Sequence, residues 1–122
     1  MAEDPESLVR GRRILVVEDE FFIAEELRHA LEDLGAHVVG PVATVDAALA
    51  VVRSPDPLDG ATLDMTLGRE RSDEVARALQ ERGVPFVILS GYGERGLPED
   101  LRQIPRCEKP FDIRKVVRKL FA

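Results

Sequence analysis

The sequence predicts an α/β fold in which five parallel strands form one sheet, with helices on both of its faces. Short apolar segments alternate along the chain with segments whose apolar residues recur at helical spacing. Parallel strands need crossover connections, and the helical segments supply them. A length of 122 residues suits a single domain of this kind.

The first strand and helix follow a charged stretch over residues 1–11, which contains proline and ends in glycine. Residues 12–17 are then apolar enough for a strand. Apolar residues recur at helical spacing from Ile23 to Leu34, and Gly35 follows at a position where helices commonly end. We therefore expect a flexible N-terminal arm, 1–11, and a domain over 12–122.

Two more strand and helix pairs follow in the middle of the chain. Residues 36–42 predict the second strand, and Thr44 is placed to cap the helix after it. Residues 60–64 predict the third strand. Ser72 is placed to cap the next helix, and Gly83 to end it.

The last third of the chain predicts strands at 84–89 and 105–108, with a short helix at 98–103 between them. Asp112 is placed to cap the final helix. Between 91 and 98 there are three glycines and few helix formers. We therefore expect a mobile loop there and a fourth helix that is short.

Strand composition predicts the order 2-1-3-4-5 across the sheet. The first, third and fourth strands are apolar, whereas the second contains His37, Gly40 and Pro41, and the fifth contains Pro105 and Arg106. Proline and charge are tolerated at sheet edges. The order 2-1-3-4-5 places both of these strands at edges, and it is one of the two common doubly wound arrangements.

Composition disfavours several classes of function. Seventeen basic and 23 acidic residues give a net charge of -6, which would repel nucleic acid and an anionic membrane. The single cysteine, Cys107, has no partner for an internal disulfide, and we interpret it as a packed edge-strand residue. No apolar segment approaches the ~20 residues of a membrane span, and no secretion signal is recognisable. We expect a cytoplasmic protein.

Polar side chains gather at the predicted carboxyl ends of the strands, where ligands bind in open α/β sheets. Glu18 and Asp19 follow the first strand, Asp64 ends the third, Ser90 follows the fourth, and Lys109 follows the fifth. Three converging carboxylates repel one another unless a cation or bound protons neutralise them. A hard divalent ion with oxygen ligands, Mg²⁺, fits such a set.

A cation site that faces a lysine and a hydroxyl indicates the handling of a phosphoryl group. The two histidines, His29 and His37, fall within a predicted helix and strand, so no Ser-His or Cys-His pair is available. The best remaining nucleophile is a carboxylate, which can form an acyl phosphate. Asp64, on a central strand, is best placed for this role.

Four motifs in order resemble those of response-regulator receiver domains of bacterial two-component signalling. They are the acidic pair in VVEDE, the segment LDMTLG, the hydroxyl in ILSG and the lysine in EKPF. The likeness runs from about Arg12 to the C-terminus and implies a flavodoxin-like fold. GVPFVILSGYG and LDMTLGRE further resemble the single-domain FAT GUY subgroup, and LDMTLGRE lacks the proline that many receivers carry shortly after the aspartate.

The resemblance implies roles for individual residues. Asp64 would accept phosphate from a kinase phosphohistidine, while Ser90 and Lys109 would grip the phosphoryl oxygens. A cis peptide bond between Lys109 and Pro110 is also implied. The implied Mg²⁺ ligands are Glu18, Asp19, Asp64 and the carbonyl of Thr66.

The implied protein is a signalling switch rather than an enzyme, because its chemistry is limited to its own phosphorylation and dephosphorylation. Its partners would be a sensor histidine kinase or phosphotransfer protein and a downstream protein target, with no nucleic acid and no membrane. The family suggests that the region of the first and fifth predicted helices meets the kinase. No effector segment follows the last helix, so we expect output through protein binding by a monomer, with dimerisation on phosphorylation left open.

Some positions depart from the family pattern or need a choice between readings. Arg106 stands where most receivers carry an aromatic switch residue. It could extend over the surface, pair with an acid or reach the phosphoryl group, and Tyr92 could move in place of the aromatic.

Phe21 and Phe22 are adjacent on one helix, so we expect one to pack and the other to be exposed. We interpret Glu20 as an exposed first-turn charge.

Three other functions stay open. A Mg²⁺-dependent phosphohydrolase could use the same carboxylates, although no second acid closely follows Asp64 and no cap insertion is present. A flavin or nucleotide binder would need a phosphate loop after the first strand, where Glu18 and Asp19 would repel phosphate. An unphosphorylated adaptor that has lost switching is consistent with Arg106.

Overall fold

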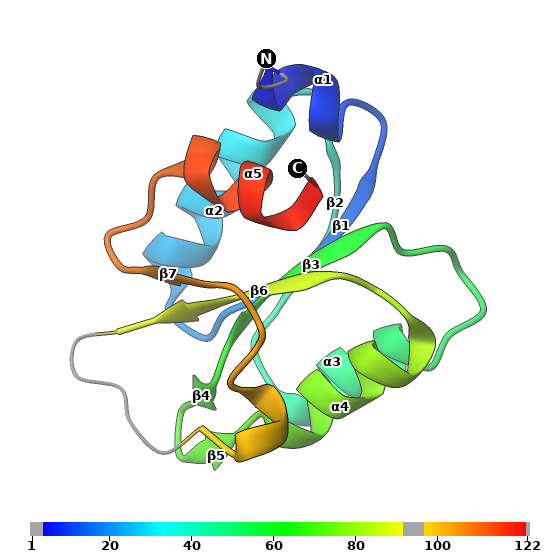
Figure 1. Ribbon diagram of the computed structural model, residues 1–122, viewed down its shortest axis with the longest axis vertical. Helices are drawn as coiled ribbons and strands as arrows, with labels where there is room; N and C mark the ends of the chain where they lie inside the picture. The colour runs from blue at the N-terminus through cyan, green and yellow to red at the C-terminus, as the bar shows by residue number, and fades with distance from the viewer. Residues whose placement is uncertain (1–3, 92–96, 122) are drawn as a thin grey trace.

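The computed structural model describes residues 4–91 and 97–121, and its centre is one parallel sheet (Figure 1). The strands run in the order β2-β1-β3-β6-β7. This is the predicted order 2-1-3-4-5, so the fold prediction is confirmed. The sheet consists of β1 (Arg13–Val17), β2 (His37–Val42), β3 (Gly60–Asp64), β6 (Phe86–Ser90) and β7 (Arg106–Glu108).

Helices cover both faces of the sheet. Helices α2 (Phe21–Asp33) and α5 (Ile113–Phe121) lie on one face, and α3 (Val45–Val52) and α4 (Asp73–Arg82) lie on the other (Figure 1). Within the ranges that the structure describes, no helix combines the length and the apolar character needed to cross a bilayer.

The strand β1 supplies apolar side chains to a separate core on each face. Leu15 and Val17 pack in the core beneath α3 and α4, while Ile14 and Val16 pack in the core beneath α2 and α5. All four side chains are at most 1% exposed. Because both faces are covered, this strand reads as a continuous apolar run and leads directly into the acidic residues at its end.

Most predicted helix ends are confirmed, and one differs in a way that bears on the site. Thr44 Oγ1 accepts a hydrogen bond from the N–H of Ala47 at 3.1 Å, and Gly83 ends α4 with φ of +74°. Ser72 stands before α4, but its hydroxyl does not cap the helix. The hydroxyl instead donates to the carbonyl of Asp64 at 2.5 Å.

The N-terminal stretch that we expected to be a flexible arm contains a short helix, α1 (Pro5–Val9). Leu8 is 5% exposed and Val9 is fully buried, both against the core beneath α2 and α5. Beyond the helix, the Arg12 guanidinium lies 4.4 Å from the ring centroid of Phe121 in α5. A helix of five residues is too short to show periodicity, so its charged residues dominated the sequence pattern.

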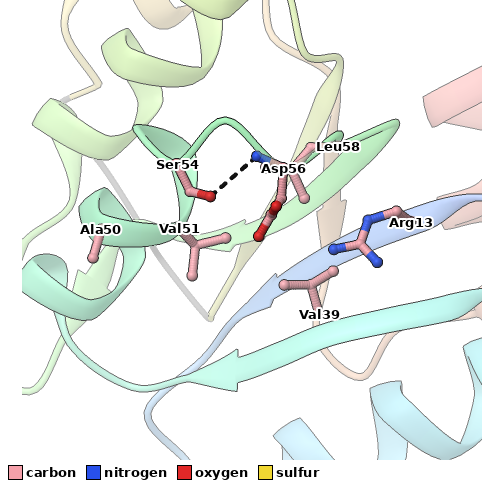
Figure 2. A pocket seen from close by; sticks show the side chains of 7 residues that line it. All are labelled: Arg13, Val39, Ala50, Val51, Ser54, Asp56 and Leu58. Atoms are coloured by element: carbon pink, nitrogen blue, oxygen red, sulfur yellow. Dashed lines mark hydrogen bonds between the residues drawn. The ribbon is translucent and has the colours of Figure 1, made fainter.

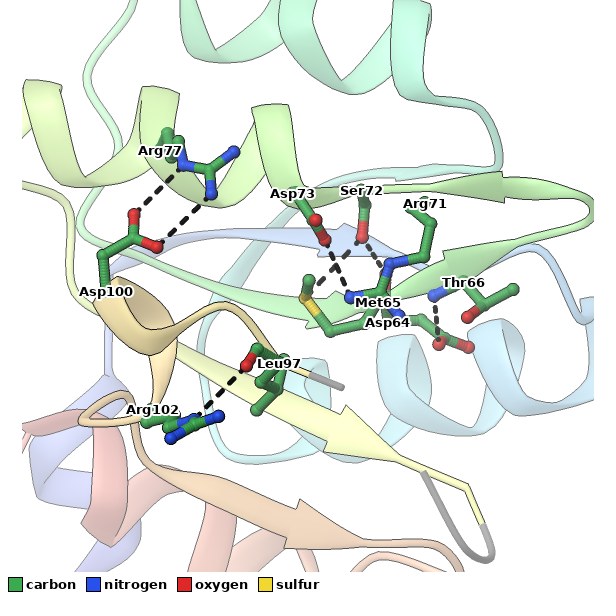
Figure 3. Close-up of polar contacts among 10 residues, drawn as sticks. All are labelled: Asp64, Met65, Thr66, Arg71, Ser72, Asp73, Arg77, Leu97, Asp100 and Arg102. Atoms are coloured by element: carbon green, nitrogen blue, oxygen red, sulfur yellow. Dashed lines mark hydrogen bonds and ion pairs between the residues drawn. The ribbon is translucent and has the colours of Figure 1, made fainter. Parts of the chain in front are cut away.

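Two short elements lie beside the carboxyl ends of the strands. A hairpin of β4 (Thr66–Leu67) and β5 (Glu70–Arg71), which the sequence did not predict, follows β3. The expected short fourth helix is a 3-10 turn, η1 (Glu99–Leu101), which the ion pair between Arg77 and Asp100 links to α4 (Figure 3). The part of the expected mobile loop at 92–96 lies outside the described residues.

We predict that Leu8→Ala lowers the free energy of unfolding by about 2 to 5 kcal/mol, because it leaves a cavity under α1. Ser7→Ala, on the exposed side of the same helix, should change stability by less than about 0.5 kcal/mol. Urea unfolding followed by circular dichroism measures both. Equal, small effects of the two substitutions would show that residues 5–9 behave as the flexible arm expected from the sequence.

Candidate functional site

Three acidic side chains meet at the carboxyl ends of the two central strands β1 and β3. Glu18 and Asp19 follow β1, Asp64 ends β3, and these strands pair directly through Val17 and Leu63. One carboxylate oxygen from each of the three residues lies within 4.8 Å of the others. The neighbouring strand ends therefore bring together the acidic residues that the sequence placed at this edge.

Lys109 joins the cluster from the edge strand β7. Its Nζ lies 2.8 Å from Glu18 Oε1 and 2.8 Å from Asp64 Oδ2, and the lysine side chain is only 17% exposed. Its backbone N–H donates to the carbonyl of Ser90 at 2.9 Å, and the implied cis bond to Pro110 is confirmed. Part of the neutralising charge therefore comes from the chain itself, whereas our sequence argument assigned it to a metal ion or protons.

Glu18 is the most buried member of the cluster, at 2% exposure. Burial raises the pKa of Glu18 to about 7, and the nearby charge of Asp64 acts in the same direction. The hydrogen bond to Lys109 and the N–H of Glu20 oppose this rise in pKa only in part. Near neutral pH, Glu18 therefore carries a proton in part of the molecules, and this bound proton removes some of the negative charge of the cluster.

Lys109 itself stays charged. Burial alone would lower the pKa of its ammonium, but hydrogen bonds from the ammonium to Asp64 and Glu18 raise that pKa above its usual value. The ammonium is thus a permanent positive charge between two carboxylates. Such a group can also stabilise negative charge that develops on an added phosphoryl group.

Backbone N–H groups orient the carboxylates. Thr66 N donates to Asp64 Oδ1 at 3.1 Å (Figure 3), and Gly68 N donates to Asp19 Oδ2 at 2.8 Å. Both donors belong to the β4–β5 hairpin or its turn. Sequence reasoning named Thr66 from the family resemblance but found neither the hairpin nor Gly68, because two-residue strands carry no periodicity to detect.

Ser90 ends β6 beside this cluster and is 9% exposed. Its strand neighbour in β7 is Glu108, the residue before Lys109. Ser90 and Lys109 are therefore adjacent across the sheet edge as well as linked by their backbones. A hydroxyl in this position is available to a ligand that enters next to Asp64.

The two phenylalanines at the start of α2 correct our expectation that one of them packs. Phe21 is 68% exposed and Phe22 is 80% exposed, and their rings contact edge to face at 5.5 Å. The inward face of the helix is occupied by Ala24 and Leu27, which are buried. Glu20, directly before this pair, is exposed as expected.

Arg106, which the family resemblance places where an aromatic switch residue is expected, is exposed on β7. Among the described residues, its side chain forms no ion pair with an acid, and its carbonyl accepts a hydrogen bond from Lys119 Nζ at 2.6 Å. The alternative in which Arg106 pairs with an acid is thus not seen there. Tyr92, which could move instead, lies outside the described residues.

A well-formed hollow lies away from the acidic cluster. A cavity of about 220 Å³ is found between the start of β1, β2 and the end of α3 (Figure 2). Arg13 contributes to it from the first position of β1, whereas Glu18 and Asp19 follow the other end of that strand. The cavity carries no cluster of acidic groups, so the chemistry is assigned to the strand ends.

Comparisons with known proteins agree with this site and fold. SdrG from Sphingomonas melonis Fr1 is 39% identical, with a TM-score of 0.79, over 90% of this chain and 96% of its own. A response regulator receiver protein from Sinorhizobium medicae WSM419 is 24% identical, with a TM-score of 0.75, over 90% and 91% of the two chains. The chain belongs to the response-regulator receiver family. No family model matches it.

Longer regulators contain a similar segment. The phyllosphere-induced regulator PhyR of Methylorubrum extorquens is 31% identical over 110 residues, which cover 85% of this chain and 41% of PhyR. The transcriptional regulatory protein PdtaR of Mycobacterium tuberculosis is 27% identical over 110 residues, which cover 87% of this chain and 53% of PdtaR. This receiver thus spans about half, or less, of the length of these curated relatives.

We predict that Glu18→Gln removes a pH dependence of stability. Because the pKa of Glu18 is raised from 4.5 to about 7, its bound proton stabilises the fold at low pH, and that contribution is lost as pH rises through about 7. As pH rises from roughly 4.5 to 8, the free energy of unfolding of the wild type should therefore fall by about 1 to 3 kcal/mol relative to that of Glu18→Gln. Urea unfolding by circular dichroism, without divalent ions, measures this.

The control for this pH series is Glu26→Gln, an exposed glutamate on α2. Its free energy of unfolding should vary with pH as that of the wild type does. If the free energies of unfolding of Glu18→Gln and the wild type differed by the same amount at all pH values, the raised pKa of Glu18 would be contradicted.

Proposed function

We propose that this receiver is a phosphorylation switch in which Asp64 accepts a phosphoryl group from a phosphohistidine of a sensor kinase or phosphotransfer protein. The observation that carries the proposal is the place of Asp64 between the acidic pair and the Lys109 ammonium, 2.8 Å from Asp64 Oδ2. The Asp64 side chain is 13% exposed, so a donor can reach it from one side.

The acidic cluster fits a resident Mg²⁺ ion. Three carboxylate oxygens within 4.8 Å of one another form a hard donor set, as Mg²⁺ requires, and Asp19 is exposed enough to leave water on the ion. Glu18, Asp19, Asp64 and the carbonyl of Thr66 would hold it. When bound, Mg²⁺ supplies positive charge against the phosphoryl oxygens.

The transfer itself follows from the nucleophile and its neighbours. An Asp64 carboxylate oxygen attacks phosphorus, the phosphorus–nitrogen bond of the donor breaks, and the imidazole leaves with the electron pair and takes up a proton. The product is an acyl phosphate on Asp64. Lys109 loses its contact with the carboxylate charge of Asp64 and pairs with the phosphoryl oxygens instead, and the Ser90 hydroxyl donates to them from β6.

The proposed partner surface lies next to this site. Phe21 and Phe22 form an exposed aromatic pair at the start of α2, directly after the acidic residues. Adjacent exposed aromatics are typical of protein contacts. We place the kinase or phosphotransfer protein over α2 and the neighbouring part of α5, and a downstream protein target as the output in the cytoplasm.

One observation favours a second function, an adaptor that binds its target without phosphorylation. Arg106 replaces the aromatic side chain, and in the described part of the chain it has no acidic partner. The adaptor would keep the fold and the partner surface but would not use Asp64 as an acceptor. The phosphorylation experiment separates the two functions.

We predict that acetyl phosphate with Mg²⁺ adds one phosphoryl group to the wild type and none to Asp64→Asn, because the amide is not a nucleophile. Intact-protein mass spectrometry in mildly acidic solvent detects the adduct, and chelation of Mg²⁺ should abolish it. Asp46→Asn, an exposed acid on α3, is the matched control and should be phosphorylated normally. Absence of the adduct from the wild type, also with a phosphorylated kinase as donor, would favour the adaptor.

A further inference from the structure

Each of the three clustered carboxylates accepts a hydrogen bond from one backbone N–H, but the three donors lie at different distances along the chain from their acceptors. Glu18 accepts from the N–H of Glu20, and Asp64 accepts from that of Thr66, two residues ahead in each case. Asp19 accepts from Gly68, which is 49 residues away. The first two contacts arise wherever the local chain turns in this way, whereas the third exists only if the β4–β5 hairpin is in place.

Asp19 depends more on its backbone donor than its neighbours do. Glu18 and Asp64 are also fixed by the Lys109 ammonium and by burial, at 1% and 13% side-chain exposure. Asp19 is exposed, and Lys109 does not pair with it within the described part of the chain. The 2.8 Å contact from Gly68 N to Asp19 Oδ2 is therefore the interaction that orients this carboxylate.

The hairpin is built to present this N–H. Leu67 pairs with Glu70, which leaves Gly68 and Arg69 as a two-residue turn, and Gly68 has φ of +62°. Glycine at the first turn position with positive φ is one of the favoured two-residue hairpin geometries. A proline at this position would supply neither the N–H nor the positive φ.

The base of the hairpin is fixed in the core and at Asp64. Leu67 is 3% exposed, and the N–H of Ser72 donates to the Met65 carbonyl at 2.9 Å. The Ser72 hydroxyl donates to the carbonyl of Asp64 (Figure 3). The hairpin thus spans from the backbone of Asp64 to the side chain of Asp19.

We propose that the Gly68 amide is a positioning group of the Mg²⁺ site: it holds Asp19 Oδ2 and so fixes the Asp19 carboxylate beside the other two before the ion arrives. This inference rests on the proposed function, since it concerns the same site. A carboxylate that is already ordered loses less conformational freedom when it binds an ion, so affinity rises without a further ligand.

A double-mutant cycle tests whether Gly68 acts through Asp19. Mg²⁺ affinity is measured by titration of backbone amide shifts in NMR spectra, because the chain has no tryptophan. Gly68→Pro should weaken Mg²⁺ binding about tenfold in the wild type, but by less than about twofold in an Asp19→Ala background. Gly68→Asn keeps the N–H and tolerates positive φ, so it should recover most of the affinity.

The controls separate positioning from general damage to the hairpin. Glu70→Ala changes an exposed side chain of β5 but no backbone donor, and should leave affinity within about twofold of the wild type. Equal weakening by Gly68→Pro with and without Asp19 would overturn the inference and leave the proposed function standing. Failure of the wild type to bind Mg²⁺ would overturn both.

A second readout needs no metal. Hydrogen exchange of the Gly68 amide in the Mg²⁺-free protein should become at least about tenfold faster in Asp19→Ala, because the acceptor is lost. Exchange in β1 and β3 should not change. Equal exchange at Gly68 in the wild type and Asp19→Ala would show that the contact does not hold the carboxylate, and would overturn the inference even if Mg²⁺ binds.

Discussion

The structure depends on the Lys109 ammonium, which lies 2.8 Å from the buried carboxylate of Glu18 and 2.8 Å from the partly buried carboxylate of Asp64. A buried charge is tolerated only when it is paired, and removal of one partner of a buried pair leaves the other uncompensated. Glu18, Asp64 and Lys109 come from the ends of β1, β3 and β7, so this single contact joins two central strands to an edge strand. The edge strand is short. Its pairing with β6, the ion pairs of Lys109 and the hydrogen bond from the Lys109 N–H to the Ser90 carbonyl together hold it against the centre of the sheet.

One ammonium does not balance three carboxylates, and that excess of negative charge explains the chemistry assigned to the site. Burial raises the pKa of Glu18, and the charge of Asp64 adds a smaller contribution in the same direction. The excess of negative charge also favours a divalent cation beside Asp19. A phosphoryl group on Asp64 would add still more negative charge. The cation and the lysine would then stabilise the same group from different sides. Metal binding and phosphorylation would therefore be coupled, because both change the net charge of the same cluster.

The features that the sequence predicted follow from local patterns along the chain, whereas most of those it missed depend on contacts between residues far apart in the sequence. Alternating apolar strands, the proline and charge of β2 and β7, and the glycine after α4 are local signals, and they gave the sheet order and most helix ends. The acidic cluster was predictable because carboxyl ends of parallel strands share one edge. The pairing of Lys109 with two acids and the bond from Gly68 to Asp19 depend on tertiary contacts, and Pro5–Val9 is too short for a periodic pattern.

The parts of the site differ in how they can respond to a change of charge at Asp64. The strands β1 and β3 are packed on both faces by side chains with almost no exposure, so they have little room to move. The hairpin and β7 touch the cluster through few polar bonds: Gly68 to Asp19, Ser72 to the Asp64 carbonyl, and Lys109 to the acids. In the proposed switch, a new charge on Asp64 would alter these bonds first. The change would then reach the rest of the molecule through the hairpin and the edge strand, while the central strands hold the acidic residues in place.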